Sequence, residues 1–474
     1  MFLGPYYYEF LNAFPSLTMT SIYFVGFLFV VFLFARFYRS ILRPFVLLIA
    51  NVIFIVSFSK EAFMYIFIIA LASYLFGFVL DKYKSKGVIT GIITLYVLIL
   101  LYFKYAGLFT TESIIMPLGL SFYSFKVMSY LFDVYYEKME TEKNILYFLN
   151  YVFFFPTLIA GPIHRSKAFF EELRNKPEFD YKEAKGGAVQ VFLGIFEKLV
   201  FTDFIALIVS LIFDNPELMG MNRLFGVILY SFQIYLDFDA ISNIAIGSAR
   251  VLGFKLTKNF NSPYLAHNLK EFWHRWHISL STWFKDYLYI PLGGSRKGNF
   301  RKYINLMIVF VVSGLWHGST VNFLVWGFLH GLIQIIEDSV FSRFNTQDWS
   351  KWIKGCLKGI GIVVNFIIVS FLWLIFRYDN MTEVISVINS ILQPQSFDYE
   401  LIGITLAECY WLATILITVL VLDICRNYTD MIVLFNRLYF PIRWAIYALL
   451  IILFLIFGVY GGSFDASDFI YQFF

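Results

Sequence analysis

Repeated apolar runs long enough to form membrane helices are the feature that most restricts how this chain can fold. The first four lie near residues 19–35, 45–58, 62–80 and 88–103, with short polar joints between them. A helix needs about 20 residues to cross a bilayer, and backbone polar groups in lipid must be satisfied within the helix itself. Since 59% of the 474 residues are apolar, we predict an all-α, polytopic membrane protein with roughly 11–13 transmembrane and re-entrant helices.

Five further apolar runs extend the pattern into the second half of the chain. They lie near residues 303–317, 321–336, 356–376, 402–422 and 444–460. Only 15% of the residues are charged, whereas a soluble globular protein has about a quarter. Soluble, disordered and collagen-like chains are therefore excluded. The lipid bilayer is the expected environment, and we predict a multi-pass protein of the cell membrane.

The number of charged and sulfur-containing residues adds little to this. Cys356, Cys409 and Cys425 lie in or beside apolar stretches, without the spacing of a disulfide framework. The net charge is only +4, and nothing in it indicates a nucleic-acid partner. The positions of the basic residues are more informative, because cytoplasmic loops collect Lys and Arg.

The basic joints predict the topology. Arg36, Arg39 and Arg43 follow the first run, and Lys82, Lys84 and Lys86 follow the third, whereas residues 1–35 contain no basic residue. We therefore expect a retained first span, an outside N-terminus and both joints in the cytoplasm. Residues 255–302, with nine Lys or Arg, should be cytoplasmic. The last span should then run outward and leave residues 461–474 outside.

The middle of the chain lacks clean spans. Residues 105–165 and 187–302 mix apolar runs with Gly, Pro, His and charged residues. Broken or re-entrant helices fit this pattern better than continuous ones. Because irregular backbone at membrane depth is tolerated only where protein covers it or where it lines a wet cavity, we expect the functional site in this segment.

Histidine is scarce enough to be tested against each chemistry that uses it. The six histidines are His164, His267, His274, His277, His317 and His330. Glu271 and His274 form a Glu-x-x-His pair, but a di-iron site needs a second copy that the chain lacks. His274 and His277, three residues apart, could still share an ion. We expect no metal site.

His317 lies in Gly314-Leu-Trp-His-Gly318, at the end of an apolar run and so near membrane depth. It could be a core histidine bonded to a carbonyl, although an ionisable group inside a span is by default a hypothesis for a functional site. A neutral imidazole can take a proton from an attacking hydroxyl without first bearing a buried charge. The residue therefore favours acyl transfer to an alcohol.

Two nearby stretches allow a functional and a plain interpretation. Phe272-Trp-His-Arg-Trp-His-Ile-Ser-Leu280 joins two histidines, two tryptophans and an arginine, which is also typical of an interfacial helix. Tyr289-Ile-Pro-Leu-Gly-Gly-Ser-Arg-Lys-Gly298 could hold a donor phosphate with backbone amides and Arg296 or Lys297. A simple turn at the inner surface is the alternative.

Residues 271–294 and 314–318 together resemble the bacterial membrane-bound O-acyltransferase family, and most closely its alginate O-acetyltransferase branch. Further pieces that agree in order and spacing are Met116–Tyr123, Phe155–Ile163 and Asn259–Tyr264. The long Ile-Pro-Leu-Gly-Gly form favours the polysaccharide O-acetyltransferase branch over the D-alanyl transfer proteins. The resemblance implies a ring of helices around a central cavity, where a cytoplasmic acyl donor meets an acceptor from the other side.

The resemblance also predicts site residues and sections of the chain. It places the essential histidine at His317 and the second polar active-site residue at His277. Residues assigned to donor or substrate binding are Trp273, Arg275, Trp276, Asp286, Trp316 and Arg296. The expected sections are N-terminal transmembrane helices at 1–104, a catalytic core at 105–336, C-terminal transmembrane helices at 337–460 and an outside tail at 461–474.

The predicted function is O-acetylation of an extracytoplasmic polysaccharide. The donor would be acetyl-CoA or a carrier thioester, with no tightly bound cofactor. The partner would be an extracytoplasmic glycan transferase of the SGNH type, or the glycan itself. The tail resembles the Phe-x-Tyr endings of such systems, which makes Tyr471 a candidate acyl relay.

Alternatives remain open. The same fold could transfer D-alanyl groups or acylate peptidoglycan, and intramembrane histidines could relay protons in a transporter or flippase. A proton-coupled transporter would carry acids in its clean spans, and these spans are almost free of acids.

One departure from the branch concerns substrate contacts: the chain reads Asp237-Phe-Asp-Ala-Ile-Ser-Asn243 where the branch usually shows Asp-Phe-Ser-Gly-Tyr-Ser-Asp.

Overall fold

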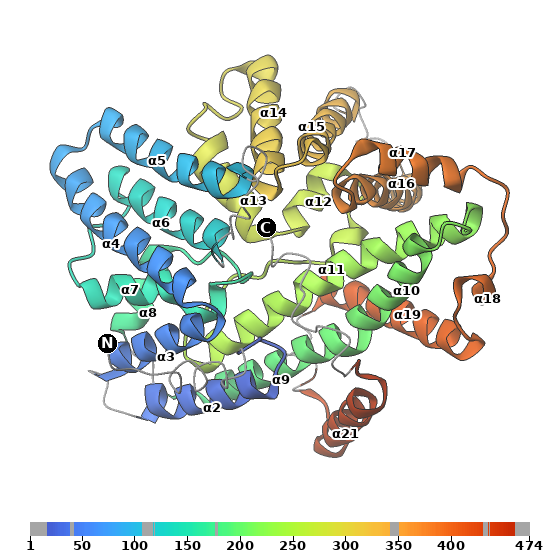
Figure 1. The fold of residues 1–474 in the computed structure, drawn as a ribbon, viewed down its shortest axis with the longest axis horizontal. Coiled ribbons are helices and arrows are strands. Elements are labelled where there is room, and N and C mark those ends of the chain that lie inside the picture. Colours follow the sequence, from blue (N-terminus) through green and yellow to red (C-terminus); the bar gives the residue numbers. More distant parts are fainter. Residues whose placement is uncertain are drawn as a thin grey trace, which may run out of the picture. The chain divides into compact units, whose positions relative to one another are not determined.

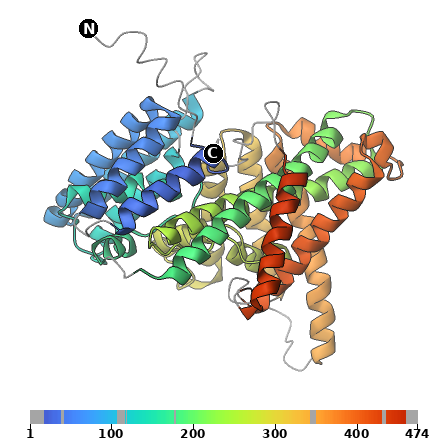
Figure 2. The same ribbon diagram turned by 90° about the horizontal axis from the view of Figure 1, so that it is seen from below.

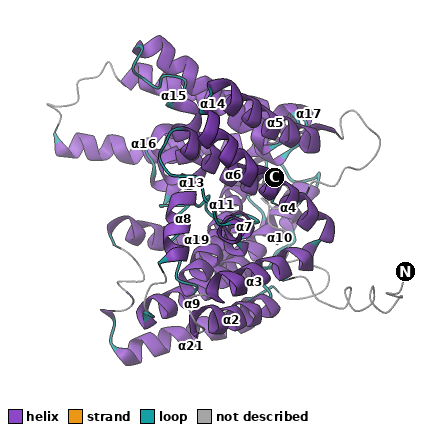
Figure 3. Ribbon diagram, turned by 90° about the vertical axis from the view of Figure 1, so that its left-hand side faces the viewer, coloured by secondary structure: helices purple, strands orange, loops and turns teal. Residues whose placement is uncertain are grey.

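Every regular element of the computed structural model is helical in the part of the chain that it describes, and that part contains no strand (Figure 3). The all-α prediction is therefore confirmed. The structure describes residues 17–37, 42–106, 117, 119–175, 179–341, 350–429, 435 and 437–459.

The chain forms two compact units. The first contains the described residues up to Ile195 together with Ile241–Thr257, and the second contains Phe196–Ala240 together with the described residues from Lys258 onward. The long helix α11 (Gly220–Val251) contributes to both units. The sections predicted with boundaries at 104, 336 and 460 do not coincide with these units and remain a functional prediction.

The first unit begins with the four predicted spans, which form four helices (Figure 1). An ion pair of 2.5 Å between Lys84 and Glu137 joins the second basic joint to the loop after α6. The helices are α2 (Ile22–Phe37), α3 (Arg43–Phe58), α4 (Lys60–Tyr83), α5 (Lys86–Tyr105), α6 (Leu120–Tyr135), α7 (Ile145–Phe153), α8 (Ser166–Arg174) and α9 (Tyr181–Phe196).

Two of the motifs that carry the family resemblance pack against each other inside this unit. Gly119 has a φ of 70°, and a Cβ there would lie 2.4 Å from the carbonyl oxygen of Leu158. The buried Lys126 donates from Nζ to Thr157 Oγ1 at 3.2 Å. Only glycine combines this backbone conformation with so close an approach. The two motifs thus contribute to the packing of the first unit.

The second unit carries the remaining predicted spans. A stacked pair of rings, Trp411 and Phe457, joins α19 to α21 with centroids 4.1 Å apart, and Figure 2 shows the two helices side by side in orange and red. Its helices are α10 (Asp203–Asp214), α12 (Leu269–Arg275), α13 (Ile278–Phe284), α14 (Gly298–His317), α15 (Val321–Phe341), α16 (Lys351–Arg377), α17 (Met381–Ile391), α18 (Tyr399–Ile402), α19 (Leu406–Tyr428) and α21 (Phe440–Phe457).

Seven helices of the described chain are long and apolar enough to cross a membrane: α4, α5, α11, α15, α16, α19 and α21. Four shorter apolar helices accompany them, at Ile22–Ala35, Arg43–Phe58, Ile145–Thr157 and Met381–Ile391. Large apolar side chains such as Ile22, Leu98 and Leu455 are exposed on these helices, as expected where lipid takes the place of water. The protein is thus a multi-pass membrane protein.

The prediction of broken helices throughout 187–302 is wrong for α11. This helix runs unbroken for 32 residues and reaches the hydropathy of a membrane span, with 78% of its most apolar window buried. Its polar residues obscured the span, because a sequence pattern does not distinguish a polar residue facing lipid from one facing protein. Beyond α11 the prediction holds, since residues 258–297 form only short helices and turns.

Acidic residues lie inside α11, a helix that was not among the clean spans predicted from the sequence. Asp237 lies 2.8 Å from the ammonium of Lys198. Lys198 belongs to a π-helical turn, η4 (Glu197–Thr202), and its ammonium also contacts Asp203 at 2.9 Å. Asp239 accepts from Arg426 at 2.8 Å. In the segment that departs from the alginate branch, these two aspartates therefore form internal ion pairs.

Candidate active site

Two glycines bring α14 and α15 into backbone contact and so fix the position of His317. A Cβ at Gly314 would lie 2.3 Å from the carbonyl oxygen of Phe323, and a Cβ at Gly327 would lie 2.3 Å from that of Phe310. Any larger residue would push the helices apart. His317 is the last residue of α14 and is therefore held at the end of a closely packed helical hairpin.

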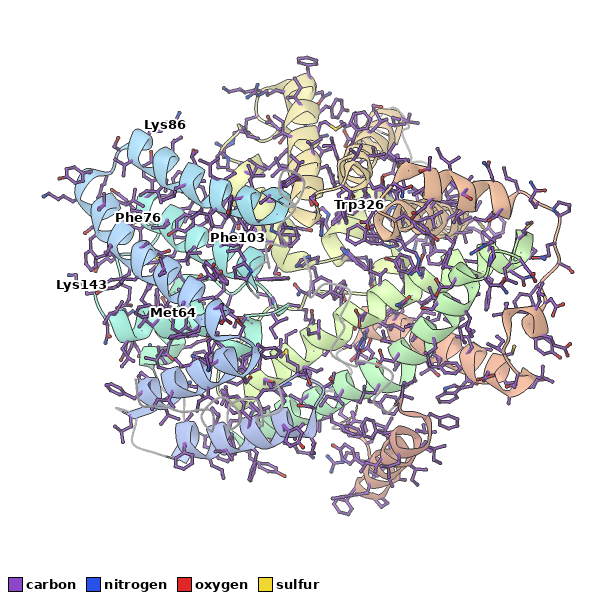
Figure 4. All side chains as sticks on the ribbon, in the orientation of Figure 1. Met64, Phe76, Lys86, Phe103, Lys143 and Trp326 are labelled. Carbon is purple, nitrogen blue, oxygen red and sulfur yellow. The ribbon has the colours of Figure 1, made fainter. Side chains whose placement is uncertain are left out.

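Aromatic rings surround the His317 imidazole, which is only 3% exposed. Its ring centroid lies 4.7 Å from that of Trp316, 5.1 Å from that of Trp326 and 5.3 Å from that of Phe376, all in edge-to-face geometry. Figure 4 labels Trp326 on α15. Such rings exclude water and hold the imidazole in one orientation.

His277 lies in a sharp turn between two short helices. Helix α12 ends at Arg275, Trp276 is extended, and His277 adopts a left-handed conformation with φ 40° and ψ 55° before α13 begins. Asn259 secures the turn: its backbone oxygen accepts from Ile278 N at 2.9 Å, and its side-chain oxygen accepts from Ser279 N at 3.4 Å. A left-handed non-glycine residue costs about 1–3 kcal/mol and is common at functional sites.

The turn brings His277 towards the end of α14. Its ring stands edge-on to Phe238 at a centroid distance of 4.7 Å and lies 6.4 Å from Trp316. The side chain is 1% exposed. Burial lowers the pKa of His277 to about 3, so the ring is neutral at physiological pH. The structure thus places both predicted histidines, His277 and His317, against the same tryptophan.

His274 does not take part in this arrangement. It is exposed, and its Nδ1 lies 2.6 Å from the carbonyl oxygen of Lys270. Because α12 ends between His274 and His277, the two do not share a helix face, which corrects the idea that they could bind one ion. No group of three potential metal-binding side chains occurs in the part of the chain that the structure describes.

Arg275, predicted to bind the donor, joins α12 to its surroundings. Its guanidinium contacts Glu271 at 2.8 Å, the backbone oxygen of Asn261 at 3.1 Å and the side chain of Asn427 at 3.0 Å. Glu271 also contacts His267. The contacts within the protein explain why this stretch needs an arginine, whose planar fork can bind several acceptors.

The two tryptophans of the stretch face different neighbours. Trp276 is buried and packs against Trp373, with ring centroids 4.8 Å apart, and stacks on Phe272 at 5.4 Å. Trp273 donates from its indole N–H to Nδ1 of His330 on α15 at 3.3 Å. The stretch is therefore embedded in the second unit.

The segment with Asp286 and Arg296 forms a π-helical turn, η6 (Lys285–Tyr289), followed by hydrogen-bonded turns. Gly293 N and Gly294 N donate to the carbonyl oxygens of Ile290 and Tyr289 at 3.0 and 2.9 Å. Arg296 is exposed, and its backbone N–H donates to the carbonyl oxygen of Gly293 within the turn. Three of the backbone amides that could have held a phosphate are thus occupied, which favours the simple turn.

Tyr471 and the rest of the tail lie outside the described residues. Residues that sequence reasoning did not assign to the site are Asn259, Trp326 and His330. The motif Asn259–Tyr264 belongs to the resemblance, but its sequence does not indicate that Asn259 would bind the start of α13. The contacts of Trp326 and His330 depend on how α14 and α15 pack, and the sequence carries no direct signal for them.

Comparisons with known proteins cover the segment that contains His277 and His317. The model of the membrane-bound O-acyltransferase family matches residues 136–378. A probable alginate O-acetylase of Pseudomonas putida is 34% identical over 304 residues, which are 60% of this chain and 60% of that protein. The match thus spans 60% of this curated relative, which is less than two thirds of its length.

Two other relatives carry different printed functions. A peptidoglycan O-acetyltransferase of Helicobacter pylori is 32% identical over 347 residues, or 65% of each chain. A teichoic acid D-alanyltransferase of Streptococcus thermophilus is 28% identical over 298 residues, which are 55% of this chain and 69% of that protein. All three names describe transfer of an acyl group.

Proposed function

The chain belongs to the membrane-bound O-acyltransferase family, and we propose that it transfers an acetyl group from a cytoplasmic thioester to a hydroxyl on the path to an extracytoplasmic polysaccharide. The identity to a probable alginate O-acetylase supports the acetyl group and the polysaccharide. The peptidoglycan O-acetyltransferase and the D-alanyltransferase support acyl transfer more generally.

The observation that carries the proposal is the meeting of His277 and His317 at Trp316. Both imidazoles are buried, and one of them is held in a strained turn. Imidazole side chains are well suited to proton transfer with an oxygen nucleophile. Acyl transfer to a hydroxyl requires that step.

In the proposed reaction His317 is the general base. The acceptor oxygen attacks the thioester carbonyl carbon while its proton passes to the His317 imidazole. The carbon–sulfur bond then breaks, and the imidazolium returns the proton to the leaving thiolate. His277, neutral because it is buried, donates a hydrogen bond that positions the donor or stabilises the charge on the carbonyl oxygen.

The acceptor of the first step in this proposal is Tyr471. Its phenol oxygen would receive the acetyl group from the thioester and pass it on to an extracytoplasmic transferase of the SGNH type. The variant Tyr471→Phe keeps the ring and removes the nucleophile. It should abolish glycan acetylation; acetylation at the wild-type level would exclude the relay and assign the acceptor hydroxyl to another molecule.

Reconstituted protein tests the activity and identifies the donor. Proteoliposomes receive [¹⁴C]acetyl-CoA or an acetylated carrier-protein thioester on the side that carries residues 255–302, and labelled acetyl esters are measured. One donor should label the protein or an added glycan, with free thiol released in equal amount. If neither donor loses its acetyl group, the proposed function is wrong.

A further inference from the structure

His330 is a buried histidine that the proposed reaction does not use. It lies midway along α15 with 0% exposure, and its Nδ1 accepts the indole N–H of Trp273 at 3.3 Å. A histidine buried within an apolar span is energetically costly and therefore indicates a function. The hydrogen bond from Trp273 indicates that this function depends on the contact between His330 and α12.

The chemistry of the two groups determines the form of the ring. An indole nitrogen can only donate, so Nδ1 of His330 must accept and cannot carry a proton. The single ring proton is then on Nε2, and the imidazole is neutral. If Nδ1 were protonated, it would face the indole N–H with a second donor, and the hydrogen bond would be lost.

The hydrogen bond ties α12 to the closely packed hairpin of α14 and α15. Besides its bond to His330, the Trp273 ring packs on Phe310 of α14 at a centroid distance of 5.4 Å and on Trp326 of α15 at 5.8 Å. A Cβ at Gly331 would lie only 3.0 Å from Met307 Sδ, so the hairpin is closely packed beside His330 as well.

Both predicted catalytic histidines are connected to this anchor. His277 follows Trp273 by four residues and lies two residues after Arg275, where α12 ends. On the hairpin, Trp326 contacts both His317, at 5.1 Å, and His330, at 4.7 Å. Any rotation of α12 on the hairpin would therefore change the relation of His277 to His317.

We propose that His330 is a positioning residue, which sets the distance between His277 and His317 by accepting the hydrogen bond of Trp273. The inference rests on the proposed acyl transfer, because in that reaction His277 and His317 act on the same thioester donor. Placement errors of about 1 Å can reduce an enzymatic rate about 100-fold without changing what is bound.

Four variants test the hydrogen bond separately from the packing. His330→Phe and Trp273→Phe keep an aromatic ring but remove the acceptor or the donor. His330→Asn places an amide oxygen near the position of Nδ1 and restores an acceptor. The double variant His330→Phe with Trp273→Phe tests coupling, because residues of one interaction are not additive. The readouts are kcat, KM for the thioester donor and the amount of folded protein in the membrane.

The expected result is a fall in kcat of about 10- to 100-fold in both single Phe variants, with KM for the donor unchanged in His330→Phe. The double variant should be no worse than either single one, and His330→Asn should recover most of the rate. The matched control is Trp373→Phe, since Trp373 lies in the same aromatic cluster and its indole N–H has no hydrogen-bond partner within the described residues. Its kcat should stay near that of the wild type.

Two results would overturn the inference. The first is wild-type kcat in the single Phe variants. The second is failure of His330→Asn to recover activity in a folded protein, which would make ring packing the reason for His330. An inactive wild-type protein would instead refute the proposed function, and an inactive His317→Ala beside a fully active His330→Phe would refute this inference alone.

Discussion

His277 and Trp316 face each other with ring centroids 6.4 Å apart. This contact brings the turn after α12 to the end of α14, although the residues are far apart in the sequence. Trp316 also contacts its neighbour His317, so one indole is the common wall of both histidines. The arrangement makes Trp316 a residue that controls geometry without itself exchanging protons.

Removing the Trp316 ring should therefore reduce acyl transfer without unfolding the protein. We expect Trp316→Ala to lower the rate by roughly 10- to 100-fold, because the two imidazoles lose their shared contact. Trp316→Phe retains an aromatic ring and should keep most of the activity. Acetyl transfer per amount of membrane protein measures both; equal activity of the Ala variant and the wild type would contradict this role.

The Lys198 ion pairs should contribute to stability. The ammonium lies between Asp203 and Asp237, and all three side chains are buried. Lys198→Met would leave two buried carboxylates without this cation, a change that typically costs about 3–5 kcal/mol. Thermal unfolding in detergent should show a clearly lower Tm. The exposed Lys351→Met serves as the control, and an equal Tm for both variants would contradict the prediction.

The topology is tested by single-cysteine labelling. In a background without Cys356, Cys409 and Cys425, the exposed Lys297 is replaced by cysteine. It should react with a membrane-impermeant reagent only after permeabilisation, because the basic segment is expected in the cytoplasm. Ser463→Cys, in the predicted outside tail, should react in intact cells. Labelling of residue 297 in intact cells would reverse the predicted topology.

The spans could be predicted because their apolar runs are continuous. The runs near 62–80 and 356–376 became α4 and α16 with ends shifted by a few residues. The span α11 was missed because Asp237 and Asp239 interrupt its apolar pattern, and their partners, Lys198 and Arg426, are distant in the sequence. Hydropathy depends only on which residues a segment contains. It does not show whether a charged residue in that segment has a buried partner that makes its place in a membrane helix tolerable.

The geometry around the predicted site residues could not be read from the sequence. The motifs predict His277 and His317 as site residues, but they contained no sign of the left-handed turn at His277. An isolated pattern also could not separate the exposed His274 from the buried His277, three residues later. The difference arises because α12 ends at Arg275, where Asn259 and the 259–264 loop begin to bind the backbone.

The central claim is that His317 is the general base. Loss of a general base typically lowers the rate by about 10²–10⁴. His277→Ala should lower the rate equally or less, because water can partly replace a side chain that positions the thioester donor or donates a hydrogen bond to it.

The most direct measurement is the single-turnover rate of acetyl loss from the thioester donor in proteoliposomes that contain wild-type protein or His317→Ala at equal folded amounts. We expect the variant to bind the donor but to release acetyl groups at least about 100-fold more slowly. A folded His317→Ala protein that transfers acetyl groups at the wild-type rate would contradict it.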